Sequence, residues 1–363
     1  DIASFIATNT TNAPVVATIT VTPTYTNGGV TCTGTPRTFT ITVNPTPTVN
    51  TVASQVLCNG SPTTAVTFTG AVTGTVYNWT NNNTSIGLAA SGTGNIPSFN
   101  AVNSGNAPAV ATITVMPVYT NGGVTCTGTP RTFTITVNPT PTVNLVANQV
   151  LCATFPTTAI AFTGNVAGTV YSWTNSNTAI GLGASGTGNI PSFTATNNTA
   201  VPITATITVT PVYTNGGVTC TGTPTSFTIT VNPQPTISIA ASPYTSLMFN
   251  MTTTLTATIN PAIAGSTITW YRNGIVVPGA TGTSIVVTVD GLGTYTARTT
   301  TPLGCTALSA PVVIRDSASD KVFIYPNPND GRFRIRYYSN AQNFNFLRTV
   351  LIYGAILVGL RKV

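Results

Sequence analysis

A near-identical repeat accounts for most of this chain of 363 residues. The segment Val15–Asn50 recurs with few changes at Ala109–Asn144 and then a third time, which sets a period of 94 residues. Two complete copies, the first repeat (51–144) and the second repeat (145–238), follow the C-terminal half of another copy, the half repeat (1–50). Repeats of this kind fold as a series of similar modules, so the chain is restricted to a modular architecture.

Apolar residues alternate with threonine along two segments of every copy. In the half repeat the apolar positions are Ala17, Ile19 and Val21, followed by Phe39, Ile41 and Val43. A period of two predicts strands that are buried on one face, and β-branched threonine suits the exposed face. Asn27-Gly28-Gly29 lies between the two segments and tolerates positive φ, so we expect a long hairpin-like pair. Six or seven short strands per copy predict an all-β fold of tandem Greek-key sandwiches of immunoglobulin size.

Two further features recur in each copy. The expected third strand carries a tryptophan, Trp79 or Trp173, which we interpret as a core residue; the alternative is an exposed aromatic platform for a sugar. Each copy ends in Asn-Pro-Thr-Pro-Thr or Asn-Pro-Gln-Pro-Thr, at 44–48, 138–142 and 232–236. Closely spaced prolines favour an extended, polyproline-like spacer, so the domains are expected to form a stiff rod.

The acidic residues are too few for most reaction chemistry. The chain has five aspartates, no glutamate and no histidine. General acid–base catalysis, paired-carboxylate hydrolysis and transition-metal binding need clusters of these residue types. The closest pair, Asp316 and Asp320, lies in an expected Ser-rich linker at 315–320. We therefore predict a protein that is not an enzyme and has no catalytic residue, cofactor or metal site.

The formal charge of +7 is unevenly distributed. Residues 1–271 contain only Arg37 and Arg131, whereas Arg332, Arg334 and Arg336 alternate along one expected strand near the C-terminus. Alternation places these three on one face. We interpret them as a solvated face or a protected sheet edge, with a phosphate- or lipid-binding patch as the alternative. Nucleic acid is not an expected partner.

No apolar stretch reaches the roughly 20 residues that span a bilayer, so no transmembrane segment is expected. The nearest is 350–360, which reads as a buried strand or two.

The six cysteines show no metal-ligand spacing. Pairing within repeats joins Cys58 to Cys126 and Cys152 to Cys220, leaving Cys32 and Cys305 unpaired, and is the interpretation we prefer. The alternative joins Cys32 to Cys58 and Cys126 to Cys152 across the linkers. Both schemes imply an oxidising, extracellular compartment.

The 94-residue pattern stops after 238, but strand signals continue through 239–314. This segment resembles the immunoglobulin-like modules of bacterial surface proteins. The resemblance places Trp270 in the core of the third strand and Tyr295 at the tyrosine-corner position. Cys305 has no earlier cysteine within this segment.

Two motifs suggest a bacterial group. Ser-Ile-Gly-Leu, Gly-Thr-Gly-Asn-Ile-Pro-Ser-Phe and Phe-Thr-Ile-Thr-Val-Asn-Pro make the 94-residue copies similar to the PKD-like repeats of Bacteroidota adhesins. The tail 321–363 resembles a partial type A sorting domain of the type IX secretion system, whose machinery would then be a partner. The residues that carry this second resemblance are Tyr325, Pro326, Asn327, Pro328, Gly331 and Phe333. Asp316-Ser317-Ala318 fits the O-glycosylation site of the same phylum, with Ser317 as the acceptor.

The expected function is that of an extracellular structural or adhesive stalk or fibre on the bacterial surface. An incomplete first module exposes strand edges, so we hypothesise head-to-tail polymerisation by strand complementation. The donor-strand candidates are Val350, Leu351, Ile352, Tyr353, Ile356, Leu357, Val358 and Leu360. A second hypothesis is a carbohydrate-binding accessory module of a secreted enzyme. The expected partners are copies of the chain itself and host or environmental glycans.

Overall fold

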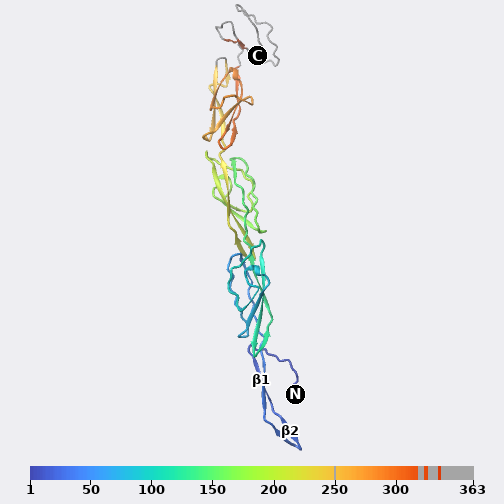
Figure 1. Ribbon diagram of the computed structural model, residues 1–363. Helices are drawn as coiled ribbons and strands as arrows, with labels where there is room; N and C mark the ends of the chain where they lie inside the picture. Colours follow the sequence, from blue (N-terminus) through green and yellow to red (C-terminus); the bar gives the residue numbers. More distant parts are fainter. Residues whose placement is uncertain (249–250, 318–322, 326–333, 337–363) are drawn as a thin grey trace, which may run out of the picture. The chain divides into compact units, whose positions relative to one another are not determined.

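The computed structural model describes residues 1–248, 251–317, 323–325 and 334–336. Within these ranges the chain is built of strands joined by turns, with three short 3-10 helices at Thr84–Ile86, Thr178–Ile180 and Val289–Gly291 (Figure 1). It forms two compact units, of which the second comprises Val231 onward together with 152–154 and 197–202. The all-β prediction is confirmed, and no helix among the described residues has the length and apolarity to cross a membrane.

The half repeat contains a two-stranded sheet and a separate hairpin (Figure 1). Strand β1 (Val15–Val21) pairs antiparallel with β4 (Arg37–Val43), and β2 (Thr24–Asn27) pairs with β3 (Val30–Thr33). Gly28 and Gly29 form the hairpin turn with φ of 59° and 86°, a region that glycine enters without steric cost. The predicted hairpin-like pair is therefore confirmed.

One six-stranded sheet dominates the first repeat, in the order β5-β10-β8-β6-β7 with β9 also paired to β8. The strands are β5 (Gln55–Cys58), β6 (Val76–Asn81), β7 (Ser91–Thr93), β8 (Ala109–Asn121), β9 (Val124–Thr127) and β10 (Arg131–Asn138). The opposite layer is made of extended segments held by single bridges, such as Val66 with Ile96. Phe68, Ile113, Phe133 and other apolar side chains fill the space between the layers.

The second repeat reproduces this arrangement, in the order β11-β16-β14-β12-β13 with β15 paired to β14. Its strands are β11 (Gln149–Cys152), β12 (Val170–Asn175), β13 (Ser185–Thr187), β14 (Ile203–Asn215), β15 (Val218–Thr221) and β16 (Thr225–Asn232).

The repeat tryptophans are core residues. Trp79 and Trp173 are only 6% and 8% exposed. Each lies directly over a glycine of the neighbouring strand, Trp79 over Gly92 and Trp173 over Gly186, where a Cβ atom would overlap the indole. The interpretation as core residues is confirmed, and the alternative of an exposed sugar platform formed by these two residues is wrong.

The fourth domain, which follows the second repeat, is a two-sheet sandwich. One sheet has the order β17-β19-β22 and the other β18-β25-β23-β20-β21, with β24 paired to β23. The strands are β17 (Thr236–Ser242), β18 (Ser246–Leu247), β19 (Thr252–Asn260), β20 (Thr267–Arg272), β21 (Ile275–Val276), β22 (Ser284–Thr288), β23 (Gly293–Thr300), β24 (Thr306–Leu308) and β25 (Val312–Asp316).

Two aromatic residues occupy the places that the immunoglobulin resemblance implied. Trp270 is fully buried, and its Nε1 donates to the carbonyl of Gly282 at 2.9 Å. The Tyr295 hydroxyl donates to the carbonyl of Gly291, four residues earlier, as in a tyrosine corner.

In the tail, β26 (Phe323–Tyr325) pairs antiparallel with β27 (Arg334–Arg336). The expected strand through Arg334 and Arg336 is present, and Arg332 lies outside the described residues. So do Pro326, Asn327, Pro328, Gly331 and Phe333 of the sorting motif, Asp320, and the donor-strand segment 350–360. The domain limits expected from the sequence stay a prediction.

Because Gly186 lies against Trp173, we expect Gly186→Ala to destabilise the second repeat by about 1–3 kcal/mol through overpacking. Denaturant unfolding followed by tryptophan fluorescence measures this. Gly183→Ala is the matched control, because a Cβ there meets no atom closer than 4.0 Å. Equal unfolding midpoints for the two variants would contradict the packing argument.

Candidate functional site: the junction between repeats

Each long strand serves two modules. In the first repeat, the first half of β8 pairs with β10 inside the sandwich, and its last residues pair with β9. The paired ends form a protruding hairpin that we call the arm, at 118–127 in the first repeat and 212–221 in the second. The alternating threonine pattern continues into the arm, so the ladder is not interrupted where the sandwich ends.

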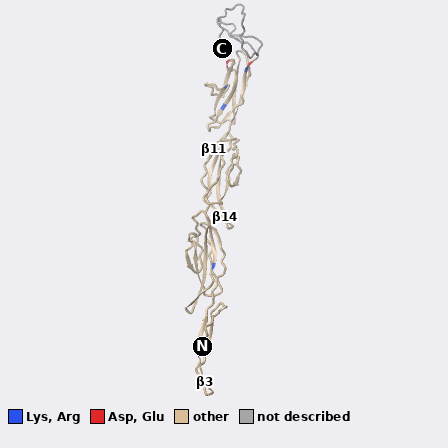
Figure 2. Cartoon of the chain, turned by 90° about the vertical axis from the view of Figure 1, so that its right-hand side faces the viewer, with Lys and Arg blue, Asp and Glu red and all other residues tan. Residues whose placement is uncertain are grey.

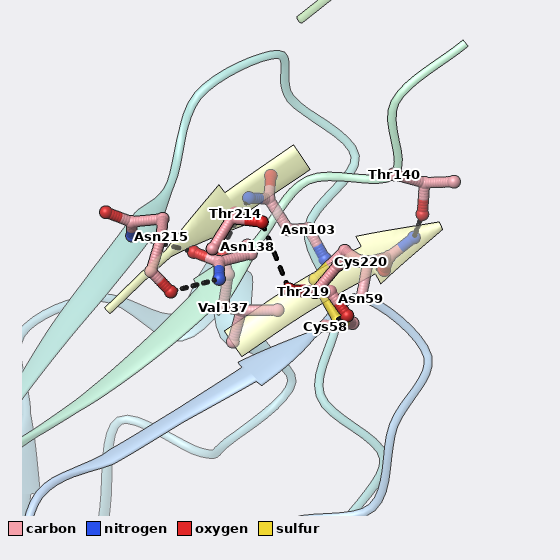
Figure 3. Close-up of a disulfide and its surroundings, with 10 residues drawn as sticks. All are labelled: Cys58, Asn59, Asn103, Val137, Asn138, Thr140, Thr214, Asn215, Thr219 and Cys220. Atoms are coloured by element: carbon pink, nitrogen blue, oxygen red, sulfur yellow. Dashed lines mark hydrogen bonds between the residues drawn. A yellow bond between two sulfur atoms is a disulfide. The ribbon is translucent and has the colours of Figure 1, made fainter. Parts of the chain in front are cut away.

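The arm of the second repeat reaches the first repeat. Its turn residue Gly216 lies beside Val56 of β5. A Cβ atom at position 216 would be only 3.0 Å from a methyl carbon of Val56. Cys220, on β15 of the same arm, forms a disulfide with Cys58 at the end of β5, with a Cα–Cα distance of 5.5 Å (Figure 3). This bond closes a loop of 162 residues, which corresponds to about 5 kcal/mol in the chain-entropy model.

A pair of asparagines lies beside this disulfide (Figure 3). The side-chain amide of Asn138 donates to the backbone carbonyl of Asn215 at 3.1 Å, and the Asn215 amide donates back to Oδ1 of Asn138 at 2.8 Å. Asn138 is fully buried. Two neutral, reciprocal hydrogen bonds therefore hold the tip of the arm to the end of β10.

The proline linker is part of the same junction. Pro139 and Pro141 are buried, and a Cβ on Gly222 at the base of the arm would overlap the carbonyl oxygen of Pro141. Asn59 adds a bond from its amide to the Thr140 hydroxyl at 3.0 Å. The linker is packed against the arm instead of acting as a free spacer.

The junction between the half repeat and the first repeat has the same construction without the disulfide. The Asn44 amide donates to the carbonyl of Asn121 at 3.0 Å, and the Asn121 amide donates to Oδ1 of Asn44 at 2.9 Å. Gly128 lies against Pro47 as Gly222 lies against Pro141. Cys126, which corresponds to Cys220, is a half-buried free thiol.

A second disulfide joins Cys152 at the end of β11 to Cys305 of the fourth domain, with a Cα–Cα distance of 5.8 Å. Cys305 is buried, in the turn before β24. Next to it, Gln234 of the linker donates from its amide to the carbonyl of Thr306 at 2.7 Å. In the fourth domain, the cysteine that bonds to the preceding repeat therefore lies in a short loop, whereas in the second repeat it lies in the arm.

The predicted disulfide pairing is wrong in both forms. Cys58 does not meet Cys126, because β5 ends beside the last residue of β10 whereas Cys126 lies in the arm, opposite Tyr119. About ten strand residues separate these two ends of the sheet, roughly 30 Å, and a disulfide needs Cα atoms within about 7 Å.

The same geometry separates Cys152 from Cys220, and the alternative pairs across the linkers are likewise not formed. Cys32 is free, as predicted. Cys305, expected to be unpaired, is bonded, whereas Cys126, expected to be bonded, is free.

Other chemistry is sparse among the described residues. No group of three or more metal-ligating side chains occurs there. Charged residues are few along most of the described chain (Figure 2), and only 5% of the sequence is charged. Burial raises the pKa of the Tyr77 and Tyr171 phenols, a consequence of core packing. Ser317, the expected glycosylation acceptor, is half-buried, and its backbone N–H donates to the carbonyl of Leu247 at 3.0 Å.

Comparison with known proteins identifies the class of module. Residues 153–235 match the family model of a PKD-like domain. Solved structures of tandem extracellular domains also match, at low identity and low TM-score. Domains 3–5 of Drosophila OTK are 13% identical, with 71% of this chain and 94% of that one covered and a TM-score of 0.28.

The ectodomain of mouse nectin-like molecule 4 is 14% identical, with 74% and 99% covered and a TM-score of 0.28. Mouse cadherin-23 EC22–24 is 12% identical, with 75% and 99% covered and a TM-score of 0.32. No curated protein matches the sequence. The family match covers the second repeat, and the described part of the chain is built of β-sandwich modules.

We expect peptide mapping without reduction to recover Cys58–Cys220 and Cys152–Cys305. Thiol titration of the denatured, unreduced chain should count two reactive groups, at Cys32 and Cys126. Recovery of a disulfide-linked Cys58–Cys126 peptide would show that the disulfides form within repeats instead of between modules.

Asn138→Ala should destabilise the junction by about 1–3 kcal/mol, because it leaves the side-chain amide and the backbone carbonyl of half-buried Asn215 without these partners. Denaturant unfolding and the rate of limited proteolysis at the arm measure the effect. Asn144→Ala is the control, since the Asn144 amide makes one exposed hydrogen bond, to the Thr163 hydroxyl. A loss no greater than that of the control would exclude the asparagine pair as a structural element.

Proposed function

We propose that this chain is a load-bearing segment of an extracellular structural or adhesive stalk on a bacterial surface. The observation that carries the proposal is that each disulfide joins one module to the next, at two successive junctions. Disulfides persist in oxidising compartments, which supports an extracellular location. Bonds between modules add little to the core of either one, but they control how far two modules can separate.

The two disulfides overlap along the sequence, and this sets the covalent path of a force applied at the chain ends. The path reaches Cys58, crosses to Cys220, runs back along the chain to Cys152 and crosses to Cys305. Only the segment 152–220 remains on the path between the first and last of these cysteines. Most of the first repeat and most of the fourth domain lie outside this path. The applied force therefore does not extend them, even when they are unfolded.

Two finer parts of the proposal rest on sequence resemblance. The Tyr-Pro-Asn-Pro motif at 325–328 supports export by the type IX secretion system of a member of the Bacteroidota, with Ser317 as an O-glycosylation site. The repeat tryptophans, which would form the platform in the carbohydrate-binding alternative, are buried.

Pulling single molecules from their two ends tests the proposal. We expect the fully extended length to be about 600 Å greater after reduction than before it, since reduction returns the bypassed segments to the path at ~3.4 Å per residue. Equal extended lengths before and after reduction would overturn the proposal of a disulfide-limited stalk.

Two variants are matched for this experiment. Cys220→Ser combined with Cys152→Ser should extend without reductant as far as the reduced chain does. Cys32→Ser should behave like the unmodified chain, because Cys32 forms no bond.

A further inference from the structure

The three proline linkers differ at the residue between their two prolines. This residue is threonine in the linkers at 44–48 and 138–142, and it is glutamine, Gln234, in the linker at 232–236. Each linker with threonine precedes a repeat that carries an arm. The linker with glutamine precedes the fourth domain, whose bonded cysteine lies in a turn. The middle residue of the linker therefore differs with the kind of module that follows.

A second position differs together with the middle residue. Asn59, which follows the bonded cysteine of the first repeat, corresponds to Ala153 in the second repeat. The backbone contacts of the two positions are the same. The N–H of Asn59 donates to the carbonyl of Asn138 at 2.9 Å, and the N–H of Ala153 donates to the carbonyl of Asn232 at 2.9 Å. The two ends therefore differ in their side chains and not in their backbone.

At the end of the first repeat, the two side chains bond to each other. The Asn59 amide donates to the Thr140 hydroxyl at 3.0 Å, and Oδ1 of Asn59 accepts from the N–H of Asn103 at 2.8 Å (Figure 3). These partners all belong to the first repeat and its own linker, so the bonds do not reach the arm. The arm is held instead by the bonds between Asn138 and Asn215.

At the end of the second repeat, the linker side chain bonds to the next module. Ala153 has no amide to offer, and Gln234 is longer than threonine. The Gln234 amide reaches the carbonyl of Thr306 at 2.7 Å. Thr306 directly follows Cys305, which is bonded to Cys152. The contact therefore lies beside the disulfide that joins the two modules.

The turn of the fourth domain cannot supply the contact that the arm supplies. The N–H of Thr301 donates to the carbonyl of Cys305 at 2.9 Å, and the N–H of Cys305 donates to the Thr301 hydroxyl at 3.0 Å. The turn 301–305 contains no asparagine, so it has no equivalent of Asn215. A polar contact from the linker itself replaces the one that the arm makes.

Glutamine is not the residue that the linker alone favours. Oε1 of Gln234 is buried, and no described residue donates a hydrogen bond to it. A buried acceptor without a partner carries a desolvation cost. The bond from the amide to Thr306 offsets this cost only when the fourth domain is in place, so Gln234 suits the docked module better than the isolated linker.

We propose that the middle residue of the linker, together with the residue after the bonded cysteine, determines which kind of module docks at the end of a repeat. Thr140 with Asn59 forms an end that receives an arm-bearing repeat. Gln234 with Ala153 forms an end that receives a two-sheet sandwich whose cysteine lies in a turn. The order of modules along the chain, a property beyond the load-bearing role proposed above, is then set by these two positions.

The test measures the Cys152–Cys305 disulfide of the full chain in glutathione redox buffers, with each disulfide quantified by peptide mapping after alkylation. The effective concentration of the two thiols reports how firmly the fourth domain is docked. We expect Gln234→Thr to lower it about two- to tenfold, the contribution of one net hydrogen bond. Gln234→Glu, which keeps the shape but removes the N–H donor, should lower it at least as much. Cys58–Cys220 is the internal reference and should not change.

Two further variants separate docking from local stability. Ala153→Asn combined with Gln234→Thr recreates the pair of the first repeat, and the effective concentration should stay as low as in Gln234→Thr alone. Thr140→Ala is the matched control, because it removes the bond from Asn59 but leaves the arm held by Asn138. It should change the effective concentration of Cys58 and Cys220 by less than about twofold.

An unchanged Cys152–Cys305 bond in Gln234→Thr, or its recovery in the double variant, would overturn the proposal and make Gln234 a packing residue of the linker. Equal losses in Gln234→Thr and Thr140→Ala, each at its own junction, would also overturn it. None of these results affects the pulling experiment, which depends on which cysteines are bonded and not on the linker side chains.

Discussion

Continuity of one β-ladder beyond its own sandwich is the constraint on which the repeat array depends. The first half of β8 or β14 buries its apolar face in a core, and its second half projects as an arm with no core of its own. An isolated two-stranded hairpin is marginal in water. The arms of the first and second repeats lie against the preceding module, so the strand that completes one domain also contacts the domain before it.

The contacts that seat the arm are neutral. Amide–carbonyl bonds between asparagines, buried prolines and glycines without a Cβ replace the ion pairs that many interfaces use. Neutral hydrogen bonds are little affected by salt, whereas exposed ion pairs weaken as ionic strength rises. A junction of this composition is therefore expected to keep its stability as the salt concentration varies.

Much of the fold could be predicted because strand pattern is a local property. The period of two located the strands, and the tryptophans and Tyr295 were correctly placed in cores. The disulfides could not be predicted, because a near-identical repeat offers the same interval between Cys58 and Cys126 as between Cys152 and Cys220. The pairing is determined by the end of the sandwich at which each cysteine lies. Cys58 lies beside the end of β10, and Cys126 lies in the arm at the opposite end. The Asn-Gly-Gly turn just before Cys126 and Cys220 was a signal of this, since it places both on a hairpin tip.

The spacing of the bonded cysteines has a consequence for biosynthesis. Cys58 is made long before Cys220, so its thiol has no partner until nearly the whole of the following module has been synthesised. During that interval the chain contains other cysteines that could react with it in error. The cysteine at the end of the first strand of each complete repeat therefore has no partner until most of the following module has been synthesised.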